Sequence, residues 1–185
     1  LPPFEDRELI IEKDQGVHDI IKEVVAAHKF FANDYDKIAG FFSGDFKELF
    51  DFCKKNIKYD IESEENQTTR SPAAILTLGH GDCKHYASFI GGLLDALKRD
   101  GYKIDWKYRF ASYDIFNSAP GHVFIVAKEN GKEIWIDPVL KTFNERLKPS
   151  YIIDKRIGML KRISAIEPGG MTDQQISDSL PVTLI

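Results

Sequence analysis

The sequence predicts an α+β fold, in which a group of helices precedes an antiparallel sheet. Apolar residues recur at helical spacing as far as about residue 99, whereas from about residue 102 they alternate with polar residues. An Asn-Gly pair, the favoured centre of a tight hairpin turn, lies between two of the alternating segments. Helices followed by strands are typical of α+β domains, and 185 residues with 43% hydrophobic content suffice for one core.

The helices are predicted from apolar residues that repeat every three or four positions. They are expected over residues 16–32, 45–57, 72–78 and 82–99. In the last of these, apolar residues from Cys83 to Leu97 form one face, which must pack against another element. Asp82 precedes this helix as an N-cap, and Gly101 follows it as a stop.

The segments between the helices are predicted to be turns and surface loops. Asn33-Asp34 indicates a turn after the first helix, and the polar stretch 60–71 indicates an exposed loop. The acidic run from Glu62 to Glu65 within that stretch is expected to be solvated. Residues 166–185 are rich in Gly, Ser, Asp and Gln, and they are expected to form a C-terminal tail.

The sheet is predicted from segments in which apolar and polar residues alternate. Strands are expected over residues 102–110, 122–128 and 133–137, and residues 151–153 are a candidate fourth strand. Asn130-Gly131 joins the second and third strands as a type I′ hairpin turn.

A two-residue turn also fixes which residues of the hairpin face each other. On this register Phe124 faces Asp137, and His122 is a diagonal neighbour of Asp137 on the same face of the sheet. Diagonal Cβ atoms lie about 7–8 Å apart, a gap that an imidazole and a carboxylate can close with a hydrogen bond. Such a bond would hold the imidazole in one tautomer and leave its other nitrogen free to act as a base.

The two cysteines lie in different surroundings. Cys53 belongs to the apolar stripe of a helix and is expected to be a small core residue. Cys83 begins helix 82–99, where the positive end of the helix macrodipole favours the thiolate. Because Cys83 lies on the face that packs against the sheet, we expect it to meet His122 and Asp137 as an activated nucleophile. The alternative is that Cys83, His122 and Asp137 do not form a site and that each has only a structural role.

These residues resemble the motifs of the transglutaminase-like superfamily, which includes transglutaminases, bacterial cysteine peptidases and peptide N-glycanases. The matching stretches are Gly81-Asp82-Cys83-Lys84-His85-Tyr86-Ala87, Gly121-His122-Val123-Phe124-Ile125 and Trp135-Ile136-Asp137-Pro138. The resemblance covers about residues 45–140. It implies a papain-like or transglutaminase-like fold in which the nucleophile helix packs on an antiparallel sheet.

The resemblance also implies a catalytic triad that needs no metal or other cofactor. Cys83 would attack a carboxamide carbonyl, His122 would carry the thiol proton to the leaving amine, and Asp137 would orient His122. The chain would then divide into an N-terminal helical extension (1–44), a catalytic core (45–165) and the tail (166–185).

One element of the family pattern is missing from this sequence. Relatives often use a Trp or Gln upstream of the cysteine as a second donor to the oxyanion. No Trp precedes Cys83 here, and the nearest upstream Gln is Gln67. Tyr59 and Asn56 could substitute, but packing is the favoured role for Tyr59 and helix termination for Asn56.

A metal site is the alternative use of the residues around the cysteine. His80, Cys83 and His85 lie close together in the sequence. Their spacing matches no common zinc motif and a fourth ligand is missing, so no metal is expected. The two histidines are instead expected to flank the cleft or to lie in solvent.

The favoured function is a cysteine peptidase or amidase that acts on a protein or peptide substrate. A transglutaminase, which transfers the acyl group to an amine, and an inactive binding or structural module are the alternatives. The loop 111–121, with Asp114, Phe116 and Asn117, either lines the substrate groove or is a plain connection.

Partners of other classes are not expected. The net charge of −4 without a basic stripe argues against nucleic acid, and no apolar run is long enough to span a membrane. A reduced thiol is compatible with the cytoplasm, although exported cysteine hydrolases exist, and the oligomeric state is left open.

Overall fold

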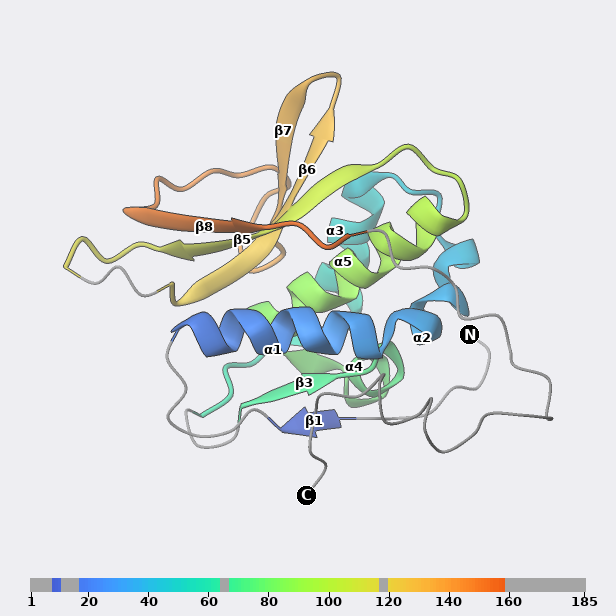
Figure 1. Ribbon diagram of the computed structural model, residues 1–185, viewed down its shortest axis with the longest axis horizontal. Helices are drawn as coiled ribbons and strands as arrows, with labels where there is room; N and C mark the ends of the chain where they lie inside the picture. The colour runs from blue at the N-terminus through green and yellow to red at the C-terminus, as the bar shows by residue number, and fades with distance from the viewer. Residues whose placement is uncertain (1–7, 11–16, 64–66, 117–119, 159–185) are drawn as a thin grey trace, which may run out of the picture.

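The computed structural model describes residues 8–10, 17–63, 67–116 and 120–158. Within these residues the fold is α+β, as predicted, with helices packed against an antiparallel sheet (Figure 1). The α-helices are α1 (Val17–Phe30), α2 (Ala32–Asp36), α3 (Phe46–Asn56), α4 (Pro72–Leu78) and α5 (Cys83–Arg99). The strands are β1 (Glu8–Ile10), β2 (Lys58–Tyr59), β3 (Thr68–Arg70), β4 (His80–Gly81), β5 (Asp105–Ser112), β6 (His122–Glu129), β7 (Lys132–Ile136) and β8 (Tyr151–Lys155).

The main sheet has four antiparallel strands in the order β7-β6-β5-β8. The candidate strand at 151–153 is confirmed as part of β8, which pairs with β5 at one edge of the sheet. The remaining strands form two small pairs: β1 runs antiparallel to β3, and β2 runs parallel to β4.

Helix α5 lies at the centre of the molecule and is buried along most of its length (Figure 1). It packs on the sheet face that carries Tyr108, Phe110, Val123 and Ile125. Helices α1, α2 and α3 also contact α5. Residues of α1 and α2, among them Val24 and Tyr35, therefore belong to the same core as the sheet. The division of the chain at residue 44 stays a prediction.

The hairpin has the register that its turn predicts. Asn130 and Gly131 both have positive φ, 50° and 78°, as a type I′ turn requires. Glu129 pairs with Lys132, and the ladder continues in the same register to Ile125 and Ile136. The next facing pair is Phe124 and Asp137, so the side chains of His122 and Asp137 share one face of the sheet.

Two of the predicted boundaries are wrong. Asn33-Asp34 lies inside α2, because this short helix buries Tyr35 against α5 and that packing outweighs the local preference for a turn. Strand β5 begins at Asp105 instead of residue 102, since Tyr102 is exposed and follows Gly101 with its positive φ of 101°.

The loop predicted at 60–71 is only partly a loop. Thr68–Arg70 forms strand β3, all three residues are buried, and the strand pairs with β1. The predicted tail 166–185 lies outside the described residues, as do Glu64 and Glu65 of the acidic run.

Candidate active site

The start of helix α5 fixes the position of Cys83. Asp82 is the N-cap, as predicted, and its Oδ1 accepts a hydrogen bond from the Lys84 N–H at 3.0 Å. The Asp82 N–H donates to Nδ1 of His85 at 3.2 Å, which completes a capping box. The hydrogen bonds found among the described residues leave the N–H of Cys83 itself unused.

His122 and Asp137 lie side by side at the end of the hairpin away from its turn. Nε2 of His122 lies 2.6 Å from Oδ2 of Asp137. The other carboxylate oxygen, Oδ1, accepts the N–H of Val139 at 3.2 Å, and the aspartate side chain is only 3% exposed. The carboxylate is therefore held from two sides, and Nδ1 of His122 remains for a further partner.

Cys83 contacts this pair from helix α5. Cys83 lies close enough to His122 for its thiol to raise the pKa of the imidazole, and Cys83 packs at the edge of the main core. As a residue, Cys83 is only partly buried. The structure thus brings together the three residue types that the sequence singled out, in the order thiol, imidazole, carboxylate.

The contact does not lie on the face of the sheet where we expected it. Helix α5 packs on the face of Val123 and Ile125, whereas His122 stacks on Phe124, which belongs to a second cluster on the opposite face. The expectation that α5 covers the His122 face is therefore wrong. Cys83 and His122 come near each other because one begins α5 and the other is the first residue of β6, where it pairs with Ala111 of β5.

Aromatic side chains hold the His122 ring from two sides. Its centroid lies 5.7 Å from that of Phe124 and 6.2 Å from that of Tyr113. Burial lowers the pKa of His122, but hydrogen bonds to Asp137 and Cys83, together with the charges of these groups, raise the pKa to about 10. The arrangement therefore favours the imidazolium form at neutral pH.

The second cysteine has the structural role that the sequence predicts. Cys53 is fully buried in the core, and burial strongly raises the pKa of its thiol. The protein therefore contains two free thiols in opposite environments, one beside a histidine and one surrounded by apolar side chains.

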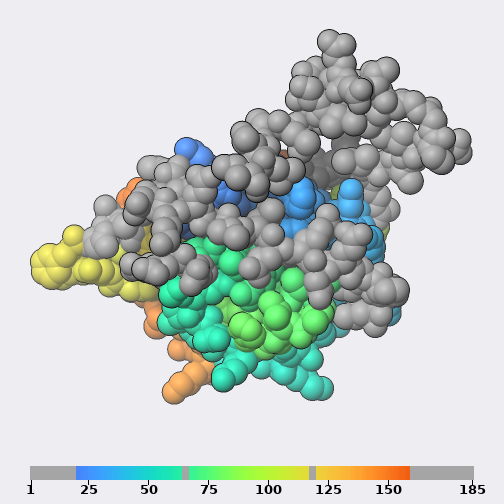
Figure 2. Space-filling model, turned by 90° about the horizontal axis from the view of Figure 1, so that it is seen from below, coloured from blue at the N-terminus to red at the C-terminus, as the bar shows by residue number. Residues whose placement is uncertain are grey.

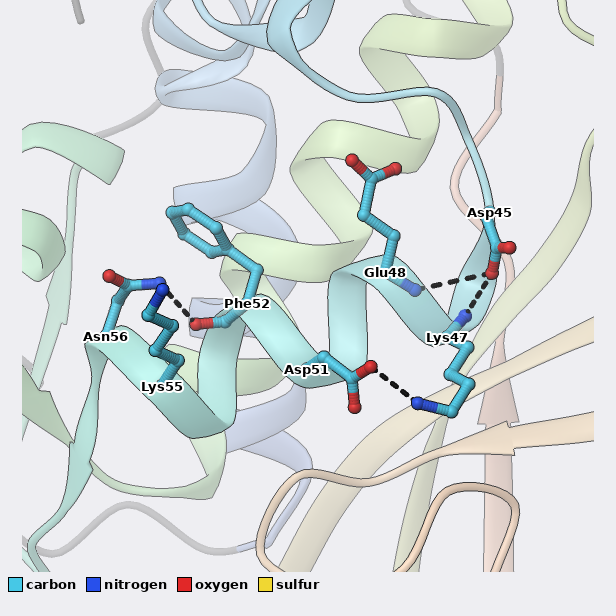
Figure 3. Close-up of a pocket in the computed structure, with 7 residues that line it drawn as sticks. All are labelled: Asp45, Lys47, Glu48, Asp51, Phe52, Lys55 and Asn56. Carbon is cyan, nitrogen blue, oxygen red and sulfur yellow. Dashed lines mark hydrogen bonds and ion pairs between the residues drawn. The ribbon is translucent and has the colours of Figure 1, made fainter.

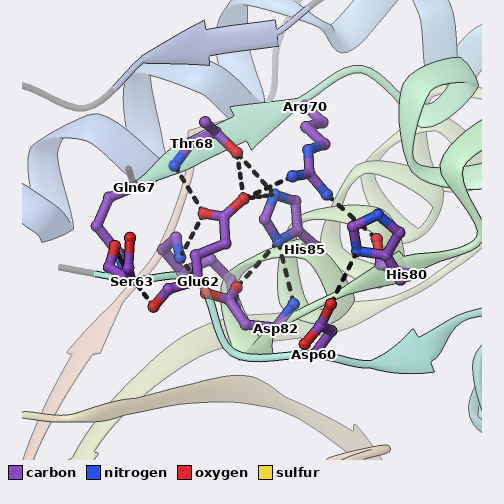
Figure 4. Close-up of polar contacts among 10 residues, drawn as sticks. Asp60, Glu62, Ser63, Gln67, Thr68, Arg70, His80, Asp82 and His85 are labelled. Atoms are coloured by element: carbon purple, nitrogen blue, oxygen red, sulfur yellow. Dashed lines mark hydrogen bonds and ion pairs between the residues drawn. The ribbon is translucent and has the colours of Figure 1, made fainter. Parts of the chain in front are cut away.

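A buried cluster of charges supports the start of α5 (Figure 4). Glu62 lies at its centre, 10% exposed, with Oε1 at 2.6 Å from Nη2 of Arg70 and Oε2 at 3.4 Å from Nζ of Lys84. The prediction that Glu62 is solvated is wrong, because two cations from other parts of the chain compensate its burial. His85, 1% exposed, lies between Glu62 and Asp82, so the expectation that it flanks the cleft is also wrong.

The same cluster is the one place among the described residues where His, Cys, Asp and Glu side chains gather closely enough to hold a metal ion. Ligand atoms of Glu62, Asp82 and His85 lie within 4.8 Å of one another. Lys84 and Arg70 already pair with the two carboxylates, so the negative charge is compensated without a metal. His80, by contrast, is partly exposed and lies 3.5 Å from Asp60.

Replacing Asp82 with alanine is expected to destabilise the protein by more than the loss of a cap alone. Removing an N-cap costs about 0.5–2 kcal/mol, and here the buried ammonium of Lys84 would also lose its nearest partner. Urea denaturation measures the change. The control is Asp45→Ala, which removes the N-cap of α3 from an exposed site. Equal losses in the two variants would show that the buried charges add nothing.

The candidates for a second oxyanion donor lie in different places. Gln67 donates its amide N–H groups to the carbonyl oxygens of Glu62 and Ser63. Asn56 donates to the carbonyl of Phe52 at the end of α3, the helix-ending role that was favoured. Tyr59, 38% exposed, is the remaining candidate.

The β5–β6 loop, which begins with Tyr113 near the His122 ring, carries two exposed apolar side chains. Beyond Tyr113, Ile115 and Phe116 are 79% and 92% exposed, and the loop projects at the yellow edge of Figure 2. The Phe116 N–H donates to Oδ1 of Asp114 at 2.8 Å, which fixes the turn. That this loop lines a substrate groove stays a prediction, and Asn117 lies outside the described residues.

A separate hollow of about 620 Å³ lies on helix α3 (Figure 3). Its lining is mainly polar and charged: Asp45, Lys47, Glu48, Asp51, Phe52, Lys55 and Asn56. Some of these charges pair along the helix, as Lys47 does with Asp51 at 2.5 Å. Neither Cys83 nor His122 lines this hollow.

Comparisons with known proteins find one distant structural similarity. The chain aligns with a crystal structure of a proposed cysteine protease from Cytophaga hutchinsonii, with a TM-score of 0.43 and 18% identity. The alignment covers 72% of this chain and 48% of that protein, so the chain spans about half the length of its neighbour. No family model and no curated protein matches the sequence. Among the described helices, none is long and apolar enough to cross a membrane.

Proposed function

We propose that the protein is a thiol-dependent acyl-transfer enzyme, with Cys83 as nucleophile, His122 as base and Asp137 as the residue that orients the histidine. The observation that carries the proposal is the place of His122, whose Nε2 lies 2.6 Å from Oδ2 of Asp137 and whose pKa is raised by the nearby Cys83 thiol. A thiol, an imidazole and a carboxylate in this order are the parts of a cysteine nucleophile with its base.

The reaction follows from this geometry. His122 takes the proton of the Cys83 thiol, and the sulfur attacks the carbonyl carbon of an amide. The imidazolium then gives the proton to the leaving amine as the C–N bond breaks, which leaves a thioester on Cys83. Water, deprotonated by His122, attacks the thioester carbonyl, the C–S bond breaks to release the acid, and the proton on His122 returns to the Cys83 sulfur. Asp137 keeps Nε2 of His122 hydrogen-bonded throughout, so that Nδ1 is the nitrogen left to exchange a proton with the thiol.

The substrate we propose is an amide of a protein or peptide, which makes the enzyme a cysteine peptidase or amidase. The three motifs that resemble the transglutaminase-like superfamily contain these three residues, and this resemblance favours the same chemistry. The partial exposure of Cys83 is compatible with a substrate that approaches from solvent. The β5–β6 loop, which starts at Tyr113 near His122, offers exposed apolar side chains for contact with such a substrate.

Alkylation of the two cysteines tests the proposal. At neutral pH, iodoacetamide is expected to modify Cys83 at least about 10²-fold faster than Cys53, because a thiolate is the reactive form and Cys53 is buried and protonated. Mass spectrometry of tryptic peptides gives both rates in one sample. Since burial alone slows Cys53, the sharper comparison is with His122→Ala, in which Cys83 stays exposed but loses its base.

The proposal fails if His122→Ala leaves the alkylation of Cys83 unchanged. An inert module that only shares the fold gives this result, with slow modification of Cys83 in both proteins. A circular dichroism spectrum of the variant shows whether the fold is intact, so that a lost site and an unfolded chain are distinguished.

A further inference from the structure

We propose that Tyr59 is a catalytic residue whose phenolic O–H is the second hydrogen-bond donor to the oxyanion. The inference rests on the proposed function, since it assigns a role in the same acyl transfer. An oxyanion site needs donors directed at the oxygen on which charge develops. The N–H of Cys83 is one such donor, and none of the hydrogen bonds found among the described residues uses it.

The backbone brings Tyr59 to the start of α5. Strand β2 pairs with β4 so that Tyr59 lies opposite Gly81, two residues before Cys83. The N–H of Lys58 donates to the Gly79 carbonyl at 2.8 Å, and the N–H of Asp60 donates to the Gly81 carbonyl at 3.0 Å. Tyr59 is therefore held on both sides by hydrogen bonds to the segment that leads into the nucleophile.

The Tyr59 ring is fixed by a second tyrosine, Tyr86. The two rings are stacked, with centroids 6.0 Å apart and an interplanar angle of 14°. Tyr86 lies one helical turn after Cys83 on α5, and side chains three residues apart share a helix face. Its hydroxyl donates to the Ile57 carbonyl at 2.7 Å, which ties this part of α5 to the β2 segment. Tyr59 thus lies over the same helix face as Cys83.

Negative charges of the site act on the hydroxyl of Tyr59. Burial raises the pKa of Tyr59, and negative charge at Cys83, Asp82 and Asp137 raises it further, to about 12. The phenol therefore keeps its proton at neutral pH and can donate a hydrogen bond. With 38% of its surface exposed, the side chain is also accessible to a bound carbonyl group.

A donor of this kind acts at one defined step. When the Cys83 sulfur forms its bond to a carbonyl carbon, the π electrons of the C=O bond move onto oxygen, and this oxyanion is what Tyr59 would stabilise. As the C=O bond forms again, the bond to the leaving group breaks. Alkylation by iodoacetamide instead displaces iodide at a saturated carbon and passes through no oxyanion. The two reactions of the same thiol therefore separate an oxyanion donor from a residue that acts on the thiol.

The experiment compares both reactions in Tyr59→Phe, which retains the ring and its stacking on Tyr86. Acylation is followed with p-nitrophenyl acetate, from the burst of p-nitrophenolate released as Cys83 becomes acetylated. We expect acylation to fall by on the order of 10²-fold, as for removal of one oxyanion donor, while alkylation by iodoacetamide is unchanged. The control is Tyr102→Phe, at an exposed tyrosine beyond the other end of α5, where both rates should equal those of the wild type.

Each other outcome has a definite meaning. Unchanged acylation in Tyr59→Phe, with fast alkylation of Cys83, overturns the role of Tyr59 and leaves the proposed function intact. A parallel fall of both rates also overturns it, because Tyr59 would then act on the thiol. If Cys83 of the wild type is neither alkylated fast nor acylated, the proposed function fails and this inference fails with it.

Discussion

Asp137→Asn is expected to lower the rate of Cys83 acylation by about 10³–10⁴-fold, the size of effect known when a triad aspartate becomes an amide. An amide can turn its NH₂ toward Nε2 of His122, which then has to accept a hydrogen bond. The ring proton would move to Nδ1, the nitrogen that has to take the proton of the thiol. The side chain keeps its size, so the fold should be retained.

The loss of the carboxylate also changes the charge of the histidine. In the wild type, hydrogen bonds and charges of Asp137 and Cys83 outweigh burial and raise the pKa of His122 to about 10. Without the carboxylate that pKa falls, so less imidazolium is present to pair with a thiolate at neutral pH. We therefore expect Cys83 of Asp137→Asn to be alkylated more slowly than that of the wild type at neutral pH. As the pH increases, solvent deprotonates the thiol, and the rate in the variant should rise toward that of the wild type.

The measurement is the burst of p-nitrophenolate at several pH values. The control is Asp105→Asn, because Asp105 is an exposed aspartate at the far end of β5 that pairs with Arg156. The control variant should react like the wild type. A burst rate in Asp137→Asn within about threefold of the wild type would show that the carboxylate does not orient the histidine.

The relation between His122 and Asp137 could be predicted because it depends on local sequence. Asn130-Gly131 fixes a two-residue turn, and the turn fixes the register of every pair along the two strands. The meeting with Cys83 is less local. Alternation places His122 on the face that α5 does not cover, so the contact depends on where the helix and the strand begin. Hydrophobic patterns determine such ends less well than they determine faces.

The burial of Glu62 could not be read from its neighbours in the sequence. A run of polar residues usually indicates solvent exposure, and nothing in that run shows which cations the fold will bring near. Arg70 and Lys84, which compensate its charge, come from β3 and from the first turn of α5. Predicting the cluster would have required the tertiary arrangement of three segments. Patterns of single segments predict which residues are apolar enough to be buried, but they do not predict compensated charges.

Arg99→Ala is expected to cause the largest loss of stability, about 3–5 kcal/mol at neutral pH, because it leaves a buried carboxylate without its cation. Arg99 pairs with Asp95 within α5 and with Asp36 of α2 at 2.7 Å, and its side chain is 5% exposed. The side chain of Asp95 is 3% exposed. After removal of Arg99, the basic group that remains near Asp95 is His28, whose Nε2 lies 3.5 Å from Oδ2 of Asp95. Urea denaturation at neutral pH measures the loss.

The pH dependence of this loss distinguishes an uncompensated charge from lost packing. Burial lowers the pKa of His28 in the wild type, and the positive charge of Arg99 lowers it further, while Asp95 raises it. His28 has a lower pKa in the folded protein than in the unfolded chain, where the pKa is about 6.5. Its contribution to stability is therefore complete above about pH 6.5 and is lost as the pH falls through the lower pKa of the folded state. Without Arg99 the pKa of His28 rises, and its protonated form can neutralise Asp95. The destabilisation should therefore be smaller at acidic than at neutral pH.

The control for this prediction is Arg156→Ala. Arg156 pairs with Asp105 at the surface, where the two side chains are 54% and 44% exposed, and such pairs contribute about 0–1 kcal/mol. A loss for Arg99→Ala that is constant across pH would assign the effect to the aliphatic part of the arginine and its hydrogen bond to the Ala32 carbonyl. A loss that diminishes in acid instead identifies Asp95 as the buried charge that Arg99 compensates, at the junction of α1, α2 and α5.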